Sequence, residues 1–333
     1  MASTPTPEDL LACRALLAAG SRSFSAAARL LPRRLRRPAT ALYAFCRIAD
    51  DAVDLEADAT AAVRQLHRRL DAMAAGRPED HPCDRAFAAV MAAYRIPREL
   101  PAALIEGFAW DAAGRRYLTL WDLHAYAARV AGAVGAMMAL LMDVRDNPRL
   151  ARACDLGVAM QLTNICRDIG EDARRGRIYL PLDWLREEGV DPARWLAAPS
   201  YLPGVRRVVE RLLAHADLLY DRAEAGIDAL PSDCRAGIRA AARLYAEIGQ
   251  VIRRPGFDPV ARRAVVPAAR KAALLAGAML PRPARLEALE DPPLEATAWL
   301  VRAIPDRQPR PPRLEDRIAA VIEALARVEG RLA

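Results

Sequence analysis

The chain has 333 residues, of which 53% are hydrophobic, so it can form either one large domain or two ordinary ones around a sizeable core. Lys271 is its single lysine, so the net charge of +7 comes from arginines, whose planar guanidinium groups suit phosphate. A charge of this sign is compatible with nucleic acid, an anionic membrane surface or a phosphorylated substrate. The arginines are scattered among acids and match no nucleic-acid-binding motif, so we expect no nucleic-acid partner.

The cysteine pattern and the N-terminus indicate a cytoplasmic protein. The six cysteines include no CxxC pair, which favours reduced thiols. Glu8 and Asp9 stand where an export signal would carry positive charge followed by an apolar run. The longest clean apolar run, Val130–Met142, is too short to cross a bilayer, which takes about 20 residues. We therefore expect the protein to be soluble or to lie peripherally on the inner face of the membrane.

Helical periodicity recurs along the chain, with turn signals at helix-length intervals. Strand-length alternation of apolar and polar residues is essentially absent, so the prediction is an all-α fold. The predicted helices are Glu8–Ala19, one that has Pro38 in its first turn and carries Asp50, Asp58–Ala75, Asp84–Arg95, Arg98–Ala113, Asp122–Asp143, Pro148–Arg174, Val205–Ala229, Ser232–Arg254, and Val260–Leu280 with an interruption at Pro267.

Two segments are predicted to lack such helices. Gly176–Gly189 reads as a loop that carries Tyr179 and Trp184. Residues 281–312 contain eight of the 25 prolines and read as a linker, followed by an appended amphipathic helix at Leu314–Leu332. We therefore divide the chain into an all-helical domain at residues 1–280 and an accessory segment at 281–333 outside the catalytic core.

Two of the predicted helices carry regularly spaced carboxylates among apolar residues. Asn164, Asp168 and Asp172 follow one another at intervals of four, and Asp50 and Asp54 have the same spacing. Side chains four residues apart stack on one helical face, with Cβ atoms about 5–6 Å apart. A buried carboxylate needs a cation or a donor, because an unpaired buried charge is very costly. Two such faces across a cavity predict divalent metal that bridges to a diphosphate.

An isolated pair of aspartates is more often surface or capping, but the duplication and the apolar flanks favour metal here. Asp51 points about 100° around the helix, which leaves a supporting role and ligation open. Arg47 either forms a simple salt bridge with Asp50 or contacts phosphate. Three arginines follow Asp172, namely Arg174, Arg175 and Arg177. Either all three belong to a solvated loop, or at least one of them faces phosphate.

The surrounding helices are rich in Ala, Leu, Val, Met and Gly, which indicates an apolar space behind the acidic groups. If diphosphate leaves an allylic carbon, the resulting carbocation survives only where water is excluded and the walls are apolar or aromatic. Charge at one end and apolar lining behind it suit a prenyl diphosphate.

Three stretches of the sequence resemble the squalene/phytoene synthase family of head-to-head prenyl transferases, and within it the bacterial phytoene synthases. They are SRSF from Ser21, ALYAFCRIADDAVD up to Asp54, and QLTNICRDIGEDARRGRIYLP from Gln161. The resemblance extends from about Ser21 to Lys271. It implies an isoprenoid synthase helical bundle around a central cavity, with Mg²⁺ or Mn²⁺ as cofactor and no NADPH. The implied reaction, in carotenoid biosynthesis, joins two geranylgeranyl diphosphates through prephytoene diphosphate to phytoene.

The resemblance also implies roles for individual residues. Metal ligands would be Asp50, Asp54, Asp168 and Asp172, with Asn164 beside them. Contacts to diphosphate or the pocket would come from Ser21, Ser23, Arg47, Gln161, Arg167 and Tyr179. Catalytic tyrosines would be Tyr126 and Tyr245, and a C-terminal arginine would be either Arg262 or Arg263. Without the resemblance, helix capping is the simpler explanation for the two serines.

Other functions and roles stay open at this point. A relative that uses C15 substrates, and makes presqualene diphosphate, squalene or dehydrosqualene, would share every motif. A catalytically silent assembly factor is disfavoured, because it has no reason to keep two acidic faces. The small residues at 131–136 either let helices pack closely or leave room for a C20 chain. We favour the second, because a C20 chain needs a deep tunnel, and it predicts that Gly135→Leu shortens the accepted substrate. Monomer and homodimer are both compatible with the sequence.

Overall fold

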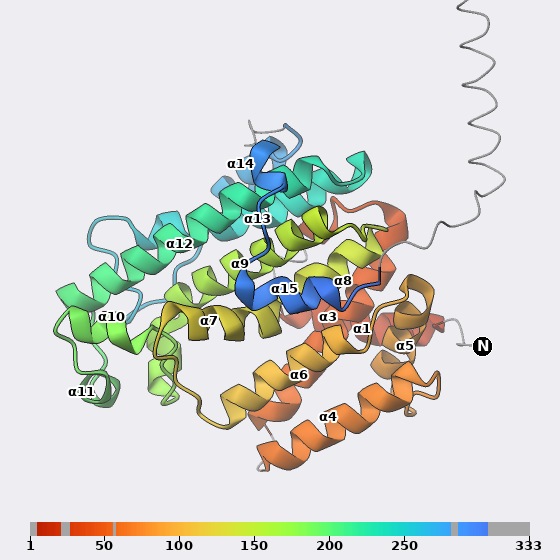
Figure 1. Ribbon diagram of the computed structural model, residues 1–333, viewed down its shortest axis with the longest axis horizontal. Coiled ribbons are helices and arrows are strands. Elements are labelled where there is room, and N and C mark those ends of the chain that lie inside the picture. The colour runs from red at the N-terminus through yellow and green to blue at the C-terminus, as the bar shows by residue number, and fades with distance from the viewer. Residues whose placement is uncertain (1–4, 21–26, 56–57, 281–285, 306–333) are drawn as a thin grey trace, which may run out of the picture.

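The computed structural model describes residues 5–20, 27–55, 58–280 and 286–305, and within these ranges every regular element is a helix (Figure 1). This confirms the all-α prediction. The α-helices of the first half are α1 Pro7–Gly20, α3 Arg33–Leu55, α4 Ala59–Ala74, α5 Pro82–Tyr94, α6 Glu99–Ala112, α7 Leu120–Ala127 and α8 Ala133–Leu141. Those of the second half are α9 Asn147–Arg174, α10 Leu182–Glu187, α11 Pro192–Ala197, α12 Pro203–Asp228, α13 Ser232–Ile252, α14 Ala268–Gly277 and α15 Glu295–Arg302.

Helix α9 is the centre of the bundle and packs against α8, α12, α13 and α15 (Figure 1). It begins at a helix cap in which the Asp146 side chain accepts from the backbone N–H of Arg149, and Pro148 occupies its first turn. Most of its residues are buried, but half-buried positions recur at helical spacing along one face. These positions are Ala153, Met160, Gln161, Asn164, Arg167, Asp168, Glu171 and Asp172. The sequence thus buries α9 on nearly all sides and leaves one polar strip.

The predicted helix at Asp122–Asp143 is interrupted in the structure. Thr119 and Asp122 form a capping box that starts α7, and a π-helical turn, η1 at Ala128–Gly132, separates α7 from α8. Contrary to the expectation of no spanning run, Leu120–Leu141 is the one stretch of the described residues long and apolar enough to cross a membrane. Since 67% of its most apolar window is buried inside the fold, it behaves as a core helix.

Glycines let this interrupted helix approach α9. A Cβ at Gly135 would lie 2.2 Å from the carbonyl oxygen of Ala153, and one at Gly157 would lie 2.3 Å from that of Ala131. Close packing, the first of the two alternatives for these small residues, therefore accounts for Gly135, and the second also has support because Ala131 and Gly135 line an apolar cavity. Gly135→Leu would disrupt the α8–α9 contact in addition to any effect on substrate length.

Two predicted boundaries are wrong because tertiary contacts override local pattern. The segment expected to be a loop at 176–189 contains α10, in which Trp184 is buried. The helix expected from Val260 begins only at Ala268. Residues before it instead cross α9 at Gly170, where a Cβ would lie 2.0 Å from the carbonyl oxygen of Val260.

The described part of the predicted linker is not outside the core. It forms a 3₁₀ turn, η2 at Leu286–Leu289, and α15, whose Leu300 and Val301 are buried in the main cluster. The buried guanidinium of Arg152 donates to backbone carbonyls of this segment, at Ala288 and Pro292. Placing residues 286–305 in an accessory segment was therefore wrong, while the predicted helix at 314–332 lies outside the described residues.

We expect Gly135→Ala to destabilise the fold by about 2 kcal/mol, because the new methyl group collides with a backbone carbonyl that cannot move aside. The melting temperature measures the effect. Gly132→Ala is the matched control, since its Cβ would meet neighbours at an ordinary 3.5 Å. Equal melting temperatures for the two variants would contradict the close-packing explanation.

Candidate active site

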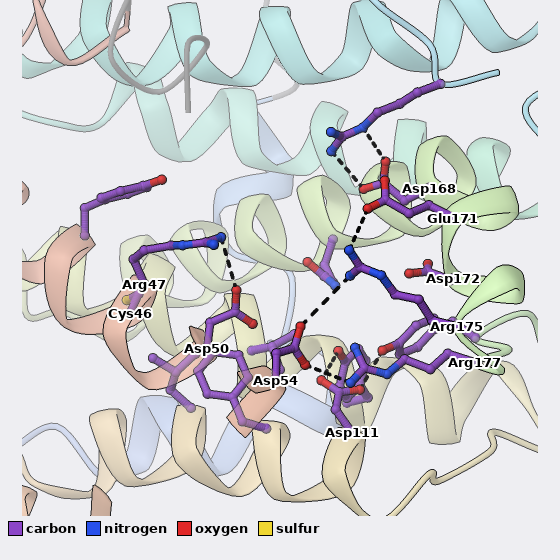
Figure 2. Close-up of a pocket in the computed structure, with 18 residues that line it drawn as sticks. Cys46, Arg47, Asp50, Asp54, Asp111, Asp168, Glu171, Asp172, Arg175 and Arg177 are labelled. Atoms are coloured by element: carbon purple, nitrogen blue, oxygen red, sulfur yellow. Dashed lines mark hydrogen bonds and ion pairs between the residues drawn. The ribbon is translucent and has the colours of Figure 1, made fainter. Parts of the chain in front are cut away.

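A polar cavity of about 400 Å³ opens between α3, α6 and α9. Helix α3 supplies Asp50 and Asp54 to one wall, and α9 supplies Asp168 and Asp172 to the facing one (Figure 2). The remaining lining residues are Tyr43, Cys46, Arg47, Leu104, Phe108, Asp111, Tyr126, Val130, Gln161, Glu171, Arg175, Arg177, Tyr179 and Arg263. The two predicted acidic faces therefore do converge on one space.

Arginines from distant parts of the chain pair with these carboxylates. Arg177 lies 2.7 Å from Asp54, and Arg263 lies 2.7 Å from Asp168 (Figure 2). Arg167, the residue before Asp168, also donates to it at 2.8 Å. Charged donors of this kind make the strongest hydrogen bonds to carboxylates, and the same guanidinium groups suit phosphate oxygens.

Burial and mutual repulsion perturb the carboxyl groups. Burial raises the pKa of Asp50 to about 6, and the charge of Asp54 adds to the shift. The pKa of Asp172 is raised to about 7 by burial and then by the charge of Asp168. Each carboxyl is thus harder to ionise beside its neighbour, as expected where acidic groups gather before a cation joins them.

Asp111 of α6 is a site residue that the sequence reasoning missed. Its carboxylate accepts hydrogen bonds from the hydroxyls of Tyr126 at 2.8 Å and Tyr179 at 2.7 Å. Burial raises its pKa to about 6, against the opposing effect of these two hydrogen bonds. Tyr117 stacks on Tyr179 with ring centroids 5.9 Å apart. The sequence does contain a pattern that could have identified Asp111. It follows Leu104 by seven residues and Phe108 by three, so it shares their apolar helical face.

The structure distinguishes the two adjacent C-terminal arginines. Arg263 lines the polar cavity, whereas the guanidinium of Arg262 lies 4.8 Å from the ring centroid of Phe257. Of the pair, only Arg263 is therefore placed to meet a diphosphate, and Arg262 drops out of the predicted site. The reason is the path of the chain over Gly170, which no local pattern specifies.

The contacts also show how the other arginines and Asp51 are placed. Arg47 donates mainly to Asp51, with Nε 2.9 Å from Oδ2, and lies 3.5 Å from Asp50. Asp51 therefore supports Arg47 at the cavity edge. Of the arginines after Asp172, Arg174 donates to the carbonyl of Val260, while Arg175 and Arg177 line the cavity.

An apolar cavity of about 290 Å³ adjoins the polar one. The two share Tyr43, Cys46, Val130 and Gln161 as lining residues. The apolar cavity runs between α3, α8, α9, α12 and α13, and its walls are mainly aliphatic. Asn164 and Tyr245, both predicted site residues, line this cavity and not the polar one. The predicted Ser21 and Ser23 lie outside the described residues.

The donor set fits a hard divalent cation that shares its coordination with phosphate. Mg²⁺ is usually held by one or two carboxylates together with substrate phosphates. The buried Oδ1 of Asn164, one turn from Asp168, has no hydrogen-bond partner in the described part of the chain. Within that part, no three acidic, His or Cys side chains are grouped as a complete metal site. The facing pairs at Asp50/Asp54 and Asp168/Asp172 thus suit ions completed by a ligand.

The sequence and fold of the chain match those of known proteins. The family described as squalene/phytoene synthase matches residues 17–270 of the chain. The chain belongs to the squalene/phytoene synthase family. Among the squalene/phytoene synthases, phytoene synthase from Rhodobacter capsulatus is 52% identical over 97% of this chain and 97% of its own length. Phytoene synthase from Cereibacter sphaeroides is 50% identical over 97% of this chain and 94% of its own length.

Solved structures of the squalene/phytoene synthase family agree with the fold. The crystal structure of a dehydrosqualene synthase in complex with ligand superposes with a TM-score of 0.75 and 31% identity, over 81% of this chain and 95% of that one. Squalene synthase HpnC from Alicyclobacillus acidocaldarius gives a TM-score of 0.69 at 29% identity, over 75% and 94%. The bundle is therefore the all-α isoprenoid synthase fold.

Asp172→Asn is expected to raise the melting temperature in the presence of a chelator at pH 8, with a smaller gain at pH 5. The proton on Asp172 favours the folded state, because its folded pKa of about 7 exceeds the ordinary 3.8, and that contribution is lost as the pH rises towards 7. The exposed Asp221→Asn is the control. A gain that does not grow between pH 5 and pH 8 would contradict the repulsion described above.

Asp111→Asn should reduce kcat by about tenfold to a hundredfold while changing KM little, because the two tyrosine hydroxyls lose a charged acceptor. Steady-state kinetics with prenyl diphosphate measure both constants. Tyr179→Phe, which removes one of the two hydrogen bonds, should have a smaller effect of the same kind. If KM rises and kcat stays constant, Asp111 serves ground-state binding and not the positioning of the tyrosines.

Proposed function

We propose that this protein is a phytoene synthase, which joins two geranylgeranyl diphosphates head to head to give prephytoene diphosphate and then phytoene. The observation that carries the proposal is the meeting of two cavities. One is lined by carboxylates and arginines, the other is apolar, and they share Gln161 and Val130. A substrate with a diphosphate head and a long hydrocarbon tail suits both. The 52% identity to a phytoene synthase over nearly the whole chain supports the C20 substrate.

The arginines at the polar end bind and orient the diphosphate groups. Arg47, Arg177 and Arg263 come from three separate segments and meet around the same space. Asp50, Asp54, Asp168 and Asp172, with Asn164, would hold Mg²⁺ or Mn²⁺. When bound, the metal would polarise phosphate oxygens and stabilise charge on the departing diphosphate. The arginines now paired with carboxylates would turn to phosphate once a substrate enters.

The walls next to the polar end protect the carbocation. Tyr126 and Tyr179 donate their hydroxyl hydrogens to Asp111, so each phenolic oxygen and ring face can turn electron density towards a cation in the cavity. The aliphatic cavity behind them excludes water that would quench it. In the first half-reaction a C–C bond forms, diphosphate leaves and a proton is lost. In the second, diphosphate leaves and a further proton is lost, so no reductant such as NADPH is required.

The substrate and product also suggest where the protein acts. Phytoene is wholly apolar and does not dissolve in water, so its release requires a lipid phase. We therefore place the protein in the cytoplasm, in peripheral contact with the inner face of the membrane. Either a monomer or a homodimer fits this proposal.

The decisive experiment is product analysis. Purified protein with Mg²⁺ and geranylgeranyl diphosphate should form phytoene, and it should do so faster than it converts the C15 donor. Asp168→Asn should lower turnover by about a hundredfold or more, because it removes a carboxylate on which both metal and arginine converge. A preference for the C15 donor, with dehydrosqualene as product, would favour the alternative. If neither donor gives a product, the assembly-factor alternative is favoured.

The apolar cavity should set the chain length. Ala153 lines it on α9, eight residues and about 12 Å from Gln161. Ala153→Phe is expected to fill the deep part of the cavity, so the ratio of kcat/KM for C20 over C15 donors should fall by about tenfold or more. Leu156→Met, a volume-conserving change in the same wall, is the control. An unchanged ratio in Ala153→Phe would show that the tail binds elsewhere.

A further inference from the structure

Helix α14 is an exposed helix with an apolar outer face. It has no buried residue. Its exposed positions include four alanines on one helical face, namely Ala269, Ala272, Ala273 and Ala276. The segment just after the helix continues this face, since Met279 is 65% exposed and Leu280 is 68% exposed. Such a surface is unusual on a soluble protein unless something covers it.

The inner side of α14 lies next to the wall of the apolar cavity. Leu275 of α14 packs in a small cluster with Ala27, Leu30 and Ala241. Ala241 of α13 also lines the apolar cavity. One side of α13 therefore borders the space proposed for the prenyl tails, and α14 packs on the same helix (Figure 1).

The chain beside the cluster is strongly basic. Arg29, Arg33 and Arg37 follow Ala27, and all three side chains are exposed. Within the described residues, none of them has an ion-pair partner, in contrast to Arg34 between them, which pairs with Asp233. Lys271 of α14 is half-buried on the side of the helix opposite the alanines, so it does not belong to this basic group. Positive charge thus lies on the segment that packs against α14 through Ala27 and Leu30.

We propose that these residues form one docking surface for an anionic lipid bilayer: the exposed face of α14, Met279 and Leu280, and the basic residues Arg29, Arg33 and Arg37. The inference rests on the proposed function, because an insoluble C40 product gives a surface beside the cavity a reason to touch lipid. Each arginine near an anionic membrane contributes to attraction, and the apolar face inserts at the level of the headgroups. A flat alanine face without aromatic anchors is a poor protein–protein hot spot.

Vesicle binding of the full chain tests this surface. Vesicles would contain phosphatidylcholine alone or with a third of phosphatidylglycerol, and co-flotation gives the bound fraction. The wild type should bind the anionic vesicles preferentially. Arg33→Gln/Arg37→Gln should weaken that binding by about fivefold for each arginine removed. Met279→Ser/Leu280→Ser should weaken it by about tenfold.

The control is Leu118→Ser/Trp121→Ser. These side chains are 51% and 55% exposed at the start of α7, which Figure 1 shows away from α14. This variant should bind vesicles like the wild type. Equal vesicle binding by all variants would overturn the proposal. So would a lower melting temperature of Met279→Ser/Leu280→Ser without vesicles, because it would mean that another part of the chain or a second copy covers the face.

Turnover in detergent separates this proposal from the proposed function. With substrate dispersed in detergent, both docking variants should keep wild-type kcat, because they lie outside the cavity. Vesicle binding without phytoene formation by the wild type would refute the proposed function and leave the docking surface standing. Phytoene formation in detergent without vesicle binding would refute the docking surface alone.

Discussion

The need to neutralise several carboxylates in one partly buried space constrains the whole bundle. Asp50, Asp54, Asp111, Asp168 and Asp172 come from three helices and face the same cavity. Their charges repel, and burial makes ionisation harder still, which is why three of their pKa values lie well above the ordinary one. Such a cluster is tolerated only with positive charge close by. The arginines at its edge supply part of that charge, and the rest is what a metal and substrate would bring.

That constraint explains features far from the cavity in sequence. Arg263 reaches Asp168 only because the chain before α14 crosses α9 in direct backbone contact at Gly170. Close approach of α8 and α9 requires Gly135 and Gly157 for the same steric reason. Backbones that meet this closely hold the side chains between them in fixed positions. The site is therefore rigid where charge must be placed, as electrostatic stabilisation of a departing group requires.

Features of the site that are set within one helix could be predicted from the sequence, whereas features that depend on contacts between distant segments could not. The spacing of Asp50 and Asp54, or of Asp168 and Asp172, is set within one helix, so it could be predicted. The hydrogen bonds of Asp111 with Tyr126 and Tyr179 join residues 15 and 68 positions apart, and no local pattern encodes them. The same holds for the choice of Arg263 over Arg262 and for the packing of α15 on the core. The many prolines of residues 281–312 predicted a linker, because proline content indicates the preferred backbone conformation and does not indicate whether a segment is buried.

The arrangement of the two cavities also bears on how the hydrocarbon product leaves the protein. In the proposed reaction the diphosphate groups would be held by fixed charges at the α3–α9 end, whereas the hydrocarbon would lie among aliphatic side chains that make no directional contacts with it. Once the second diphosphate has left, the product has lost the group that the arginines bind. What remains is apolar, and its free energy falls further only in lipid. A bilayer touching α14, which packs on the cavity-lining helix α13, would shorten the path from the reaction to that phase.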